Sequence, residues 1–273
     1  MIRDCSLTKT ELAKSLGISR SMLYYEHRQP KYDWWMKQRI EIVLREHPSY
    51  GHRRLALHLE ANKKRVLRVM RIFGIKPYRR RGRKYRKTKD YSLEYPNLLL
   101  TEYPQYKNHI WASDFTYLKH KKRIVYLATV IDLFTKEIAG FSVMSSHSVS
   151  LTINALLAAV KNNPVPGILH SDQGSEYTSK DYVALTDNLG IRISISKKAS
   201  PWENGYQESF YSQFKVDLGD PNRFGSLGEL VWAIYKTIHN YNNTRIHTTL
   251  KMPPAEFSQR QLQRSSLLLD KVS

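Results

Sequence analysis

Short apolar runs alternate with polar breaks between residues 110 and 145, and this is the clearest pattern in the chain. The runs are rich in Val, Ile, Phe and Tyr, and the breaks are His120–Arg123 and Phe134–Glu137. β-Branched and aromatic residues favour strands, and short polar breaks between such runs are typical of turns. The pattern predicts an antiparallel meander of three strands, at Ile110–Lys119, Ile124–Leu133 and Ile138–Ser145.

Beyond residue 147 the hydrophobic period changes from strand-like to helical. In Ser148–Lys161 the apolar residues recur at roughly helical spacing, which predicts a helix. The elements predicted after it are a strand at Gly167–His170, a helix at Ser179–Asn188, a strand at Ile191–Ser196 and a helix after Gly205. The order βββαβαβα predicts an α/β fold, in which a mixed five-stranded sheet has helices on both faces.

A last helical pattern follows Ser226. Its apolar residues are Leu230, Val231, Ile234, Tyr235 and Ile238, at helical spacing. Such a helix most simply packs against the sheet. A protomer interface is the alternative.

The first 25 residues have the pattern of a helix-turn-helix. Thr8 and Glu11 form a capping box, Gly17 turns the chain, and Ser19 begins a second helix. In such a unit the second helix enters the major groove of DNA. The inward-facing residues would be Leu12, Ala13, Leu16 and Leu23, and the groove-facing residues would be Arg20, Ser21 and Tyr24. A small packing unit with no DNA contact is the alternative.

A second helical unit is predicted between residues 31 and 76. Its helices would be Trp34–His47, Gly51–Glu60 and Asn62–Phe73. The last helix carries an apolar stripe of Val66, Val69, Met70 and Phe73, with arginines off the stripe. Such a stripe predicts a helix that packs on the other two.

Composition indicates a polyanion as partner. The formal net charge is +20, from 44 Lys and Arg against 24 Asp and Glu, and Lys63–Lys89 contains no acid. Neutralising phosphates with such a stretch gives strong, salt-sensitive DNA affinity without sequence preference. The residues expected to contact DNA here are Arg65, Arg68, Arg79, Arg80, Arg81 and Arg83. A solvated linker is the alternative, and a flexible tether that orders on DNA combines both.

Three carboxylates stand in distinctive local sequences. Asp114 lies in the first predicted strand, Asp172 directly follows a buried strand, and Glu208 lies in the helix after Gly205. Like charges at short range oppose ionisation, so a cluster of these carboxylates would require cations. Mg²⁺ prefers oxygen ligands, and two ions about 3.5–4 Å apart stabilise the attacking and leaving oxygens of phosphoryl transfer. The three acids predict a metal-dependent nuclease or strand-transfer enzyme.

Five motifs give the chain a specific resemblance to a known family. They are Tyr50–Arg54 (YGHRR), Trp111–Tyr117 (WASDFTY), His170–Ser179 (HSDQGSEYTS), Ser200–Phe210 (SPWENGYQESF) and Tyr241–Phe257 (YNNTRIHTTLKMPPAEF). With them the chain resembles bacterial insertion-sequence transposases of the OrfB type, members of the DDE, retroviral-integrase-like superfamily. The resemblance runs from about Pro48 to Phe257.

This resemblance implies an RNase H-like core in which Asp114, Asp172 and Glu208 hold two Mg²⁺ ions, with Mn²⁺ as a substitute. Asp114 would bridge the ions, and the other two acids would each hold one. The implied activity is that of a DNA transposase, which binds its element's ends, cuts one strand to expose a 3′-OH and joins that hydroxyl to another phosphodiester. The implied partners are double-stranded DNA of the terminal inverted repeats and the target, a second copy of the chain in at least a dimer, and possibly an upstream-frame product. Arg53 and Arg54 would belong to the family's second DNA-binding module.

The family also has a basic residue seven positions after its glutamate, which here is Lys215. Seven residues are nearly two helical turns, so Lys215 shares a face with Asn204, Glu208 and Tyr211. It would hold a phosphate of the DNA end, and a solvated surface lysine is the alternative. Two further phosphate contacts are expected at Lys197 and Lys198.

These expectations divide the chain into five segments. They are a helix-turn-helix module at 1–30, a second helical DNA-binding module at 31–76, a basic linker at 77–104, the RNase H-like domain at 105–260 and a tail at 261–273. Two other functions stay open: a non-catalytic DNA-binding regulator, and a structure-specific nuclease that cuts without joining. The single cysteine and the lack of a long apolar stretch favour a location in the bacterial cytoplasm, with the nucleoid, and not in a membrane.

Overall fold

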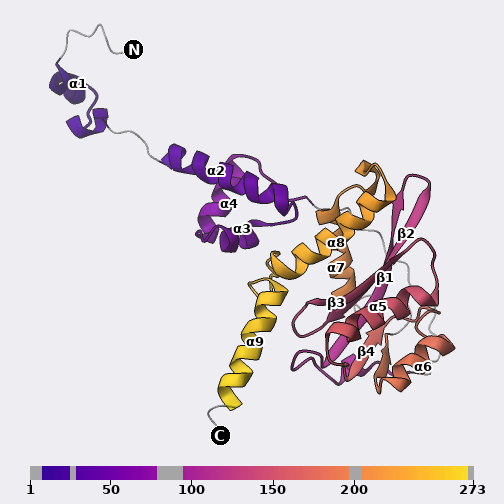
Figure 1. Cartoon of the computed structure of the whole chain (residues 1–273). Helices are drawn as coiled ribbons and strands as arrows, with labels where there is room; N and C mark the ends of the chain where they lie inside the picture. The colour runs from indigo at the N-terminus through magenta and orange to yellow at the C-terminus, as the bar shows by residue number, and fades with distance from the viewer. Residues whose placement is uncertain (1–7, 25–28, 79–94, 197–204, 270–273) are drawn as a thin grey trace.

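The computed structural model describes residues 8–24, 29–78, 95–196 and 205–269. Its centre is a sheet of β1 (Ile110–His120), β2 (Arg123–Asp132), β3 (Ile138–Met144), β4 (Ile168–Ser171) and β5 (Arg192–Ile195), in the order β3-β2-β1-β4-β5 (Figure 1). The pairs β1–β2 and β2–β3 are antiparallel, whereas β1–β4 and β4–β5 are parallel. The predicted meander and the mixed five-stranded sheet are confirmed.

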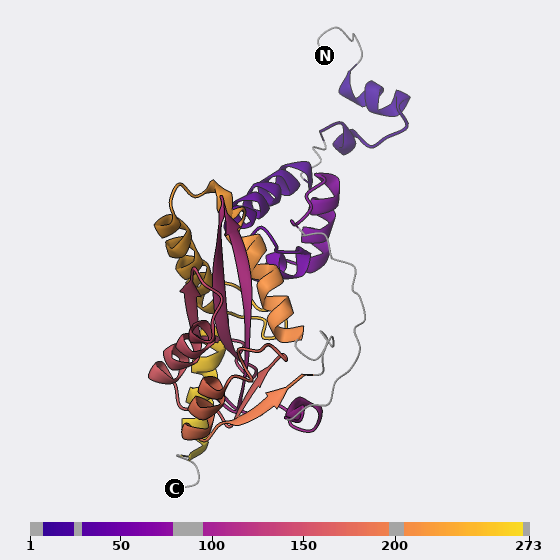
Figure 2. The same cartoon turned by 90° about the vertical axis from the view of Figure 1, so that its right-hand side faces the viewer.

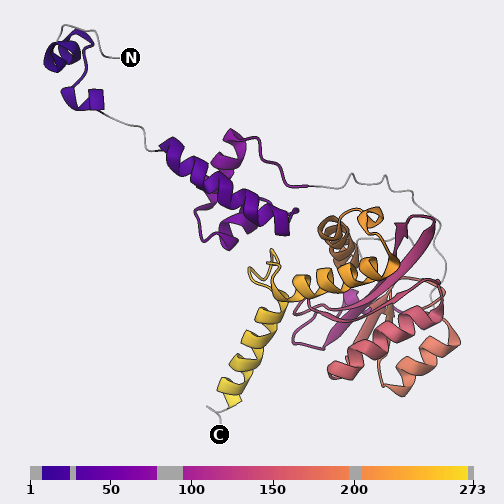
Figure 3. The ribbon, with the colours of Figure 1, turned by 45° about the horizontal axis from the view of Figure 1, so that its top comes forward.

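Helices cover both faces of this sheet, as Figure 3 shows. The helices α5 (Val149–Asn162) and α6 (Lys180–Asn188) pack on one face, and α7 (Gly205–Leu218) and α8 (Leu227–Asn243) pack on the other. Successive strand residues point to opposite faces. Accordingly, Ile110 and Ala112 of β1 belong to the core under α7 and α8, while Trp111 belongs to the core under α5.

The contact between α5 and β3 is unusually close at Gly140. A Cβ atom at this position would lie 2.4 Å from the backbone nitrogen of Ala159. Only glycine allows that approach of helix to strand. The packing of α5 on the sheet therefore depends on the absence of a side chain there.

The central strand β1 is paired unequally along its length. It pairs with β2 from Trp111 to His120, but with β4 only from Ile110 to Ala112. Beyond Ala112 the β4 side of β1 has no strand partner in the described part of the chain. Asp114 is the second residue of this open stretch.

A segment before the sheet packs along its β5 edge. The short 3-10 helix η2 (Leu98–Leu100) is held there because Leu98 N donates to Ser194 Oγ at 2.9 Å. Arg192 of β5 also forms a bidentate ion pair with Glu102, at 2.8 and 2.9 Å. Within the predicted linker 77–104, the segment 98–102 thus lies against the sheet, and residues 79–94 lie outside the described residues.

The second helical unit forms as predicted, from α2 (Gln29–Glu46), α3 (His52–His58) and α4 (Lys63–Ile72). The stripe residues Val66, Val69 and Met70 are buried in its core. The short connection from α3 to α4 is possible because Glu60 adopts a φ of 49° and Asn62 caps α4. Below, this unit is called the second helical module.

The first helical unit differs from the prediction. The capping box of Thr8 and Glu11 is present at α1 (Lys9–Ser15), and Ala13 is buried. The second helix, however, is only the 3-10 turn η1 (Arg20–Tyr24), and Leu16, predicted to face inward, is 58% exposed. Two elements this short bury little surface, and α1 packs on η1 (Figure 1), so Leu16 is left uncovered.

The C-terminal part contains two helices. Leu230, Ile234 and Ile238 of α8 are buried against the sheet, which confirms the packing role predicted for them. The helix α9 (Pro254–Leu269) projects away from the sheet (Figures 1 and 3) and runs through the boundary predicted at residue 260. In the described ranges, no helix combines the length and apolarity needed to cross a membrane.

Candidate active site

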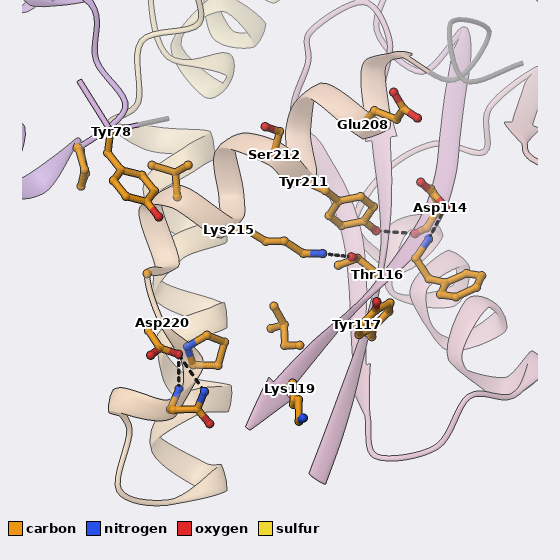
Figure 4. A pocket seen from close by; sticks show the side chains of 17 residues that line it. Tyr78, Asp114, Thr116, Tyr117, Lys119, Glu208, Tyr211, Ser212, Lys215 and Asp220 are labelled. Carbon is orange, nitrogen blue, oxygen red and sulfur yellow. Dashed lines mark hydrogen bonds between the residues drawn. The ribbon is translucent and has the colours of Figure 1, made fainter. Parts of the chain in front are cut away.

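A groove lies between α7 and the open edge of β1 (Figure 4). Its volume of about 1030 Å³ is at the upper end of the roughly 300–1,000 Å³ of small-molecule pockets. Asp114 and Glu208 lie in the groove with Lys215, and Pro48 of the second helical module and Tyr78, just after that module, also line it. A groove of this size and composition can hold part of a polymer.

Asp114 is the most perturbed carboxyl group in this groove. Its Oδ1 accepts a hydrogen bond from Phe115 N at 2.8 Å. Burial, followed by the nearby negative charge of Asp172, raises the pKa of Asp114 to about 8; Glu208 adds to the rise, and Lys215 opposes it. Asp172 and Glu208 are therefore both close enough to Asp114 to act on its charge.

Asp172 follows β4, at the same edge of the sheet. Gly174 N donates to its Oδ1 at 3.0 Å, and a Cβ atom on Gly174 would lie at the same 3.0 Å from that oxygen. Burial raises the pKa of Asp172, the Gly174 bond lowers it, and the charge of Glu176 raises it further. Glu176 is in turn paired with His147, at 2.9 Å.

Glu208 lies in the first turn of α7 and is exposed to the groove. Its place relative to Asp114 is set by two buried neighbours on the helix. Gln207 Nε2 donates to Ala112 O at 2.6 Å and to Thr129 O at 3.2 Å, and Tyr211 OH donates to Asp114 O at 2.6 Å. These residues tie α7 to the strand that carries Asp114.

The positioning role of Gln207 was not predicted from the sequence, and Tyr211 was noted only for its helix face. The available signal was a polar residue directly before Glu208, on a helix whose other buried residues are aromatic or aliphatic. A polar side chain among apolar ones is buried only when it is hydrogen-bonded.

Lys215 lies in the same groove as Glu208 and Tyr211, as the helical spacing predicts. Its Nζ donates to Thr116 Oγ1 at 2.5 Å and lies 5.6 Å from the centre of the Tyr117 ring. Figure 4 shows Lys215 reaching from α7 towards β1. This placement favours a groove residue over a solvated surface lysine, and contact with DNA stays a prediction.

The three carboxylates do not form a finished metal site. Within 8–24, 29–78, 95–196 and 205–269, no three His, Cys, Asp or Glu side chains are close enough together to hold an ion as they stand. The donor chemistry nevertheless fits Mg²⁺, because the charges of Asp172 and Glu208 both act on Asp114, and all three carboxylates are oxygen donors. Ligation would require movement of side chains, which the exposed position of Glu208 permits.

The other predicted DNA contacts fall into three groups. Arg20, Ser21 and Arg53 are exposed. Arg68 forms an ion pair with the buried Asp33 at 2.5 Å, and the Arg65 guanidinium lies 6.0 Å from the Tyr32 ring centre, so both are engaged by α2. Those outside the described side chains are Tyr24, Arg79, Arg80, Arg81, Arg83, Lys197 and Lys198.

Arg54 is placed differently from a DNA contact. Its Nη1 donates to Gln213 Oε1 of α7 at 3.3 Å. Burial, followed by the charge of Arg245, lowers the pKa of Arg54 to about 10. The side chain faces the catalytic domain and not an open surface, which favours a packing role.

The sheet order and the carboxylates near Asp114 define an integrase-type catalytic core. Two family models described as "Integrase core domain" match residues 104–201 and 189–254. The chain is 35% identical over 228 residues to the transposase for insertion sequence element IS904 of Lactococcus lactis, covering 79% of this chain and 89% of the relative. It is 32% identical to the putative transposase InsK for IS150 of Escherichia coli, covering 90% and 92%.

Among solved structures, the HTLV-2 integrase catalytic core domain in complex with magnesium aligns with a TM-score of 0.44 and 22% identity. The alignment covers 56% of this chain and 97% of that one. The family assignment rests on the insertion-sequence transposases that match this chain over most of its length. The chain belongs to the OrfB-like insertion-sequence transposases of the IS3 family, which carry an integrase core domain.

Proposed function

We propose that this protein binds the ends of its own insertion element, hydrolyses one strand at each end to free a 3′-OH, and joins that hydroxyl to a target phosphodiester. The observation that carries the proposal is the groove between α7 and β1, which Asp114, Glu208 and Lys215 line together, with Asp172 close enough for its charge to raise the pKa of Asp114. A partly buried carboxyl group among other carboxylates is typical of a site completed by cations. The groove beside it is large enough for a DNA strand.

Asp114, Asp172 and Glu208 would hold two Mg²⁺ ions, with Mn²⁺ as a substitute. When bound, such ions neutralise charge at the attacking and leaving oxygens of an in-line phosphoryl transfer. The chain's own residues orient the reacting groups. Gln207 and Tyr211 fix α7, and thus Glu208, on β1, and Lys215 lies where it can contact a phosphate in the groove.

The proposed partners follow from the need to hold two element ends together. We expect the chain to act as at least a dimer on double-stranded DNA, with the terminal inverted repeats and the target as ligands. A product of an upstream reading frame is a further candidate partner. The exposed Arg20, Ser21 and Arg53 are the described contacts we expect to reach DNA.

The test is a strand-transfer assay with labelled element-end oligonucleotides and Mg²⁺. Glu208→Gln keeps the shape of the side chain but removes its charge, and should lower cleavage and joining by on the order of 10³-fold or more, with DNA affinity retained. The matched control is Glu256→Gln on α9, whose carboxylate is paired with Arg260 at the surface.

The outcomes separate the alternatives. Joined product from wild type and from Glu256→Gln, but not from Glu208→Gln, supports the transposase. Cleavage without joining would indicate a structure-specific nuclease. DNA binding with neither reaction in wild type would contradict the proposal and favour a non-catalytic regulator.

A further inference from the structure

Two of the five sequence motifs contain none of the three acids, yet the structure brings them together. The YGHRR motif begins at Tyr50, at the start of α3, and the last motif contains Arg245, just after α8. They meet on α7, the helix that carries Glu208 and Lys215. Figure 2 shows the second helical module beside one end of that helix.

Arg245 is the centre of this contact. The side chain is 3% exposed, and its Nε donates to Asp217 Oδ2 of α7 at 2.6 Å. Its Nη2 donates to Ser49 Oγ of the second helical module at 2.7 Å and to Gln213 Oε1 of α7 at 2.5 Å. One planar guanidinium thus joins the module to the catalytic helix, a geometry that lysine cannot reproduce.

The α3 side completes the contact. Tyr50 is fully buried, and its hydroxyl accepts a hydrogen bond from Ile246 N at 2.7 Å. Ile246 packs into the hydrophobic core of the second helical module, although it lies in the loop after α8. The Arg245 cluster, defined as Ser49, Tyr50, Arg54, Gln213, Asp217 and Arg245, is therefore shared by both parts.

The cluster has a direct geometric relation to the groove. Gln213 and Asp217 lie on a different face of α7 from Lys215 and do not line the groove, but Pro48, next to Ser49, lines the same groove as Lys215 and Glu208. A shift of the module on α7 would move one wall of the groove relative to the carboxylates. Misplacement by about 1 Å can slow an enzymatic step by roughly 100-fold.

We infer that Arg245 is a positioning residue, which fixes the second helical module on α7 so that the module forms a wall of the catalytic groove and sets which phosphodiester reaches Asp114 and Glu208. This inference rests on the proposed function for its catalytic part. Its structural part, the docking through the Arg245 cluster, does not. The module is then a component of the active site, in addition to any DNA contact of its own.

The test uses Arg245→Lys in the full chain, because lysine keeps the charge beside Asp217 but cannot bind Ser49 and Gln213 at once. Tyr50→Phe is the second variant, since it removes only the hydroxyl that accepts from Ile246 N. The matched control is Arg192→Lys, which breaks the exposed bidentate pair with Glu102 at the β5 edge of the sheet. Circular dichroism melting first establishes that each variant is folded.

Two measurements then follow. Hydrogen–deuterium exchange without DNA reports docking, and we expect faster exchange in residues 49–59 of both variants and not of the control. Cleavage at saturating end DNA reports positioning, and we expect at least about a tenfold lower rate and cuts spread over neighbouring phosphodiesters. The KM for end DNA should stay within about twofold.

Unchanged exchange in both variants would overturn the docking. Faster exchange with cleavage at the wild-type rate and position would overturn the positioning role and leave the Arg245 cluster a purely structural contact. If wild type itself cuts no DNA, the proposed function fails, and the exchange measurement alone then decides the inference, since docking does not require activity.

Discussion

Two carboxylates at α7 have opposite surroundings: Asp114 of β1 faces other acids, and Asp217 of α7 itself faces an arginine. Towards β1, Asp114 is partly buried near other acids, and its pKa is raised to about 8. Towards the second helical module, Asp217 is met by the Arg245 guanidinium at 2.6 Å and by Ser49 Oγ at 3.1 Å. The surroundings of Asp114 disfavour its charged form, whereas those of Asp217 stabilise the charged form through an ion pair and hydrogen bonds.

The difference separates a site built for chemistry from one built for stability. A charge that is buried without sufficient compensation destabilises the fold, and it persists only where function requires it. A buried charge with a fork of hydrogen bonds holds two surfaces in one orientation. The helix α7 therefore lies between Asp114 of β1 and the supporting contact at Asp217.

The largest expected loss of stability comes from breaking the ion pair between Arg245 and Asp217. Arg245→Met leaves Asp217 buried without its cation, and should lower the free energy of unfolding by about 3–5 kcal/mol. Urea denaturation measures it. Arg192→Met, which breaks an exposed pair, should cost no more than about 1 kcal/mol. Equal losses in the two variants would contradict the comparison.

The second prediction concerns Asp114, whose replacement should raise the free energy of unfolding instead of lowering it. The pKa of Asp114 is about 8 in the folded protein, whereas an aspartate side chain exposed to water has an ordinary pKa of 3.8. The folded state therefore binds the proton more tightly, so the stability that Asp114 contributes is complete below pH 3.8 and is lost as the pH rises through about 8. Without metal, Asp114→Asn should be more stable than wild type at pH 8, by roughly 1–3 kcal/mol, because water entering the open groove relieves part of the burial.

Thermal melting of both proteins across this pH range checks the sign. The two melting temperatures should converge towards pH 4 and separate towards pH 8. A difference that is constant with pH would mean that Asp114 does not titrate in this window. Asp187→Asn on the exposed surface of α6 is the control, and should follow wild type throughout.

Mg²⁺ should remove much of the difference in stability between wild type and Asp114→Asn at pH 8. Binding to the carboxylates favours their ionised form, so Mg²⁺ should raise the melting temperature of wild type at pH 8 by at least about 2 °C, given the dependence of melting temperature on free energy. Asp114→Asn should respond less. An equal rise in both proteins would indicate that the ion binds elsewhere, and Ca²⁺ in place of Mg²⁺ tests the same ligands without turnover.

The smallest effect concerns Lys215, whose charge lowers the pKa of Asp114 and changes it less than burial, Asp172, Phe115 or Glu208 does. Lys215→Met should shift the pH dependence of wild-type stability upwards, by less than about one pH unit. The pH profile of the melting temperature measures the shift. A downward shift would contradict the sign of the interaction, and Lys119→Met at the far end of the groove serves as control.

The sheet and the acids could be predicted because their signals are local. Strand pairing follows from the apolar runs, and Asp114, Asp172 and Glu208 stand in distinctive motifs. The orientation of Leu16 was predicted wrongly, since helical spacing identifies an apolar face but not whether another element covers it. Leu16 is 58% exposed because α1 and η1 are too short to enclose it.

The Arg245 cluster could not be predicted, because its partners lie far apart in the sequence. Arg54 was assigned to DNA on the strength of its motif, yet its guanidinium contacts Gln213, 159 residues away. A basic residue looks the same in sequence whether it meets a phosphate or a buried amide. Gln207 is a similar case, since its place among the apolar residues of α7 could suggest burial, but its hydrogen-bond partner Ala112 lies 95 residues away in the sequence.

The shared cluster also constrains how such chains can be recombined. A chimera joined within residues 77–104 would take Ser49, Tyr50 and Arg54 from one parent and Gln213, Asp217 and Arg245 from the other. Any mismatch between the parents at these positions would leave a polar group buried at the junction. Changes in the first helical unit, or on the surface of the second helical module outside the Arg245 cluster, leave this contact intact, whereas exchange of the whole N-terminal half does not.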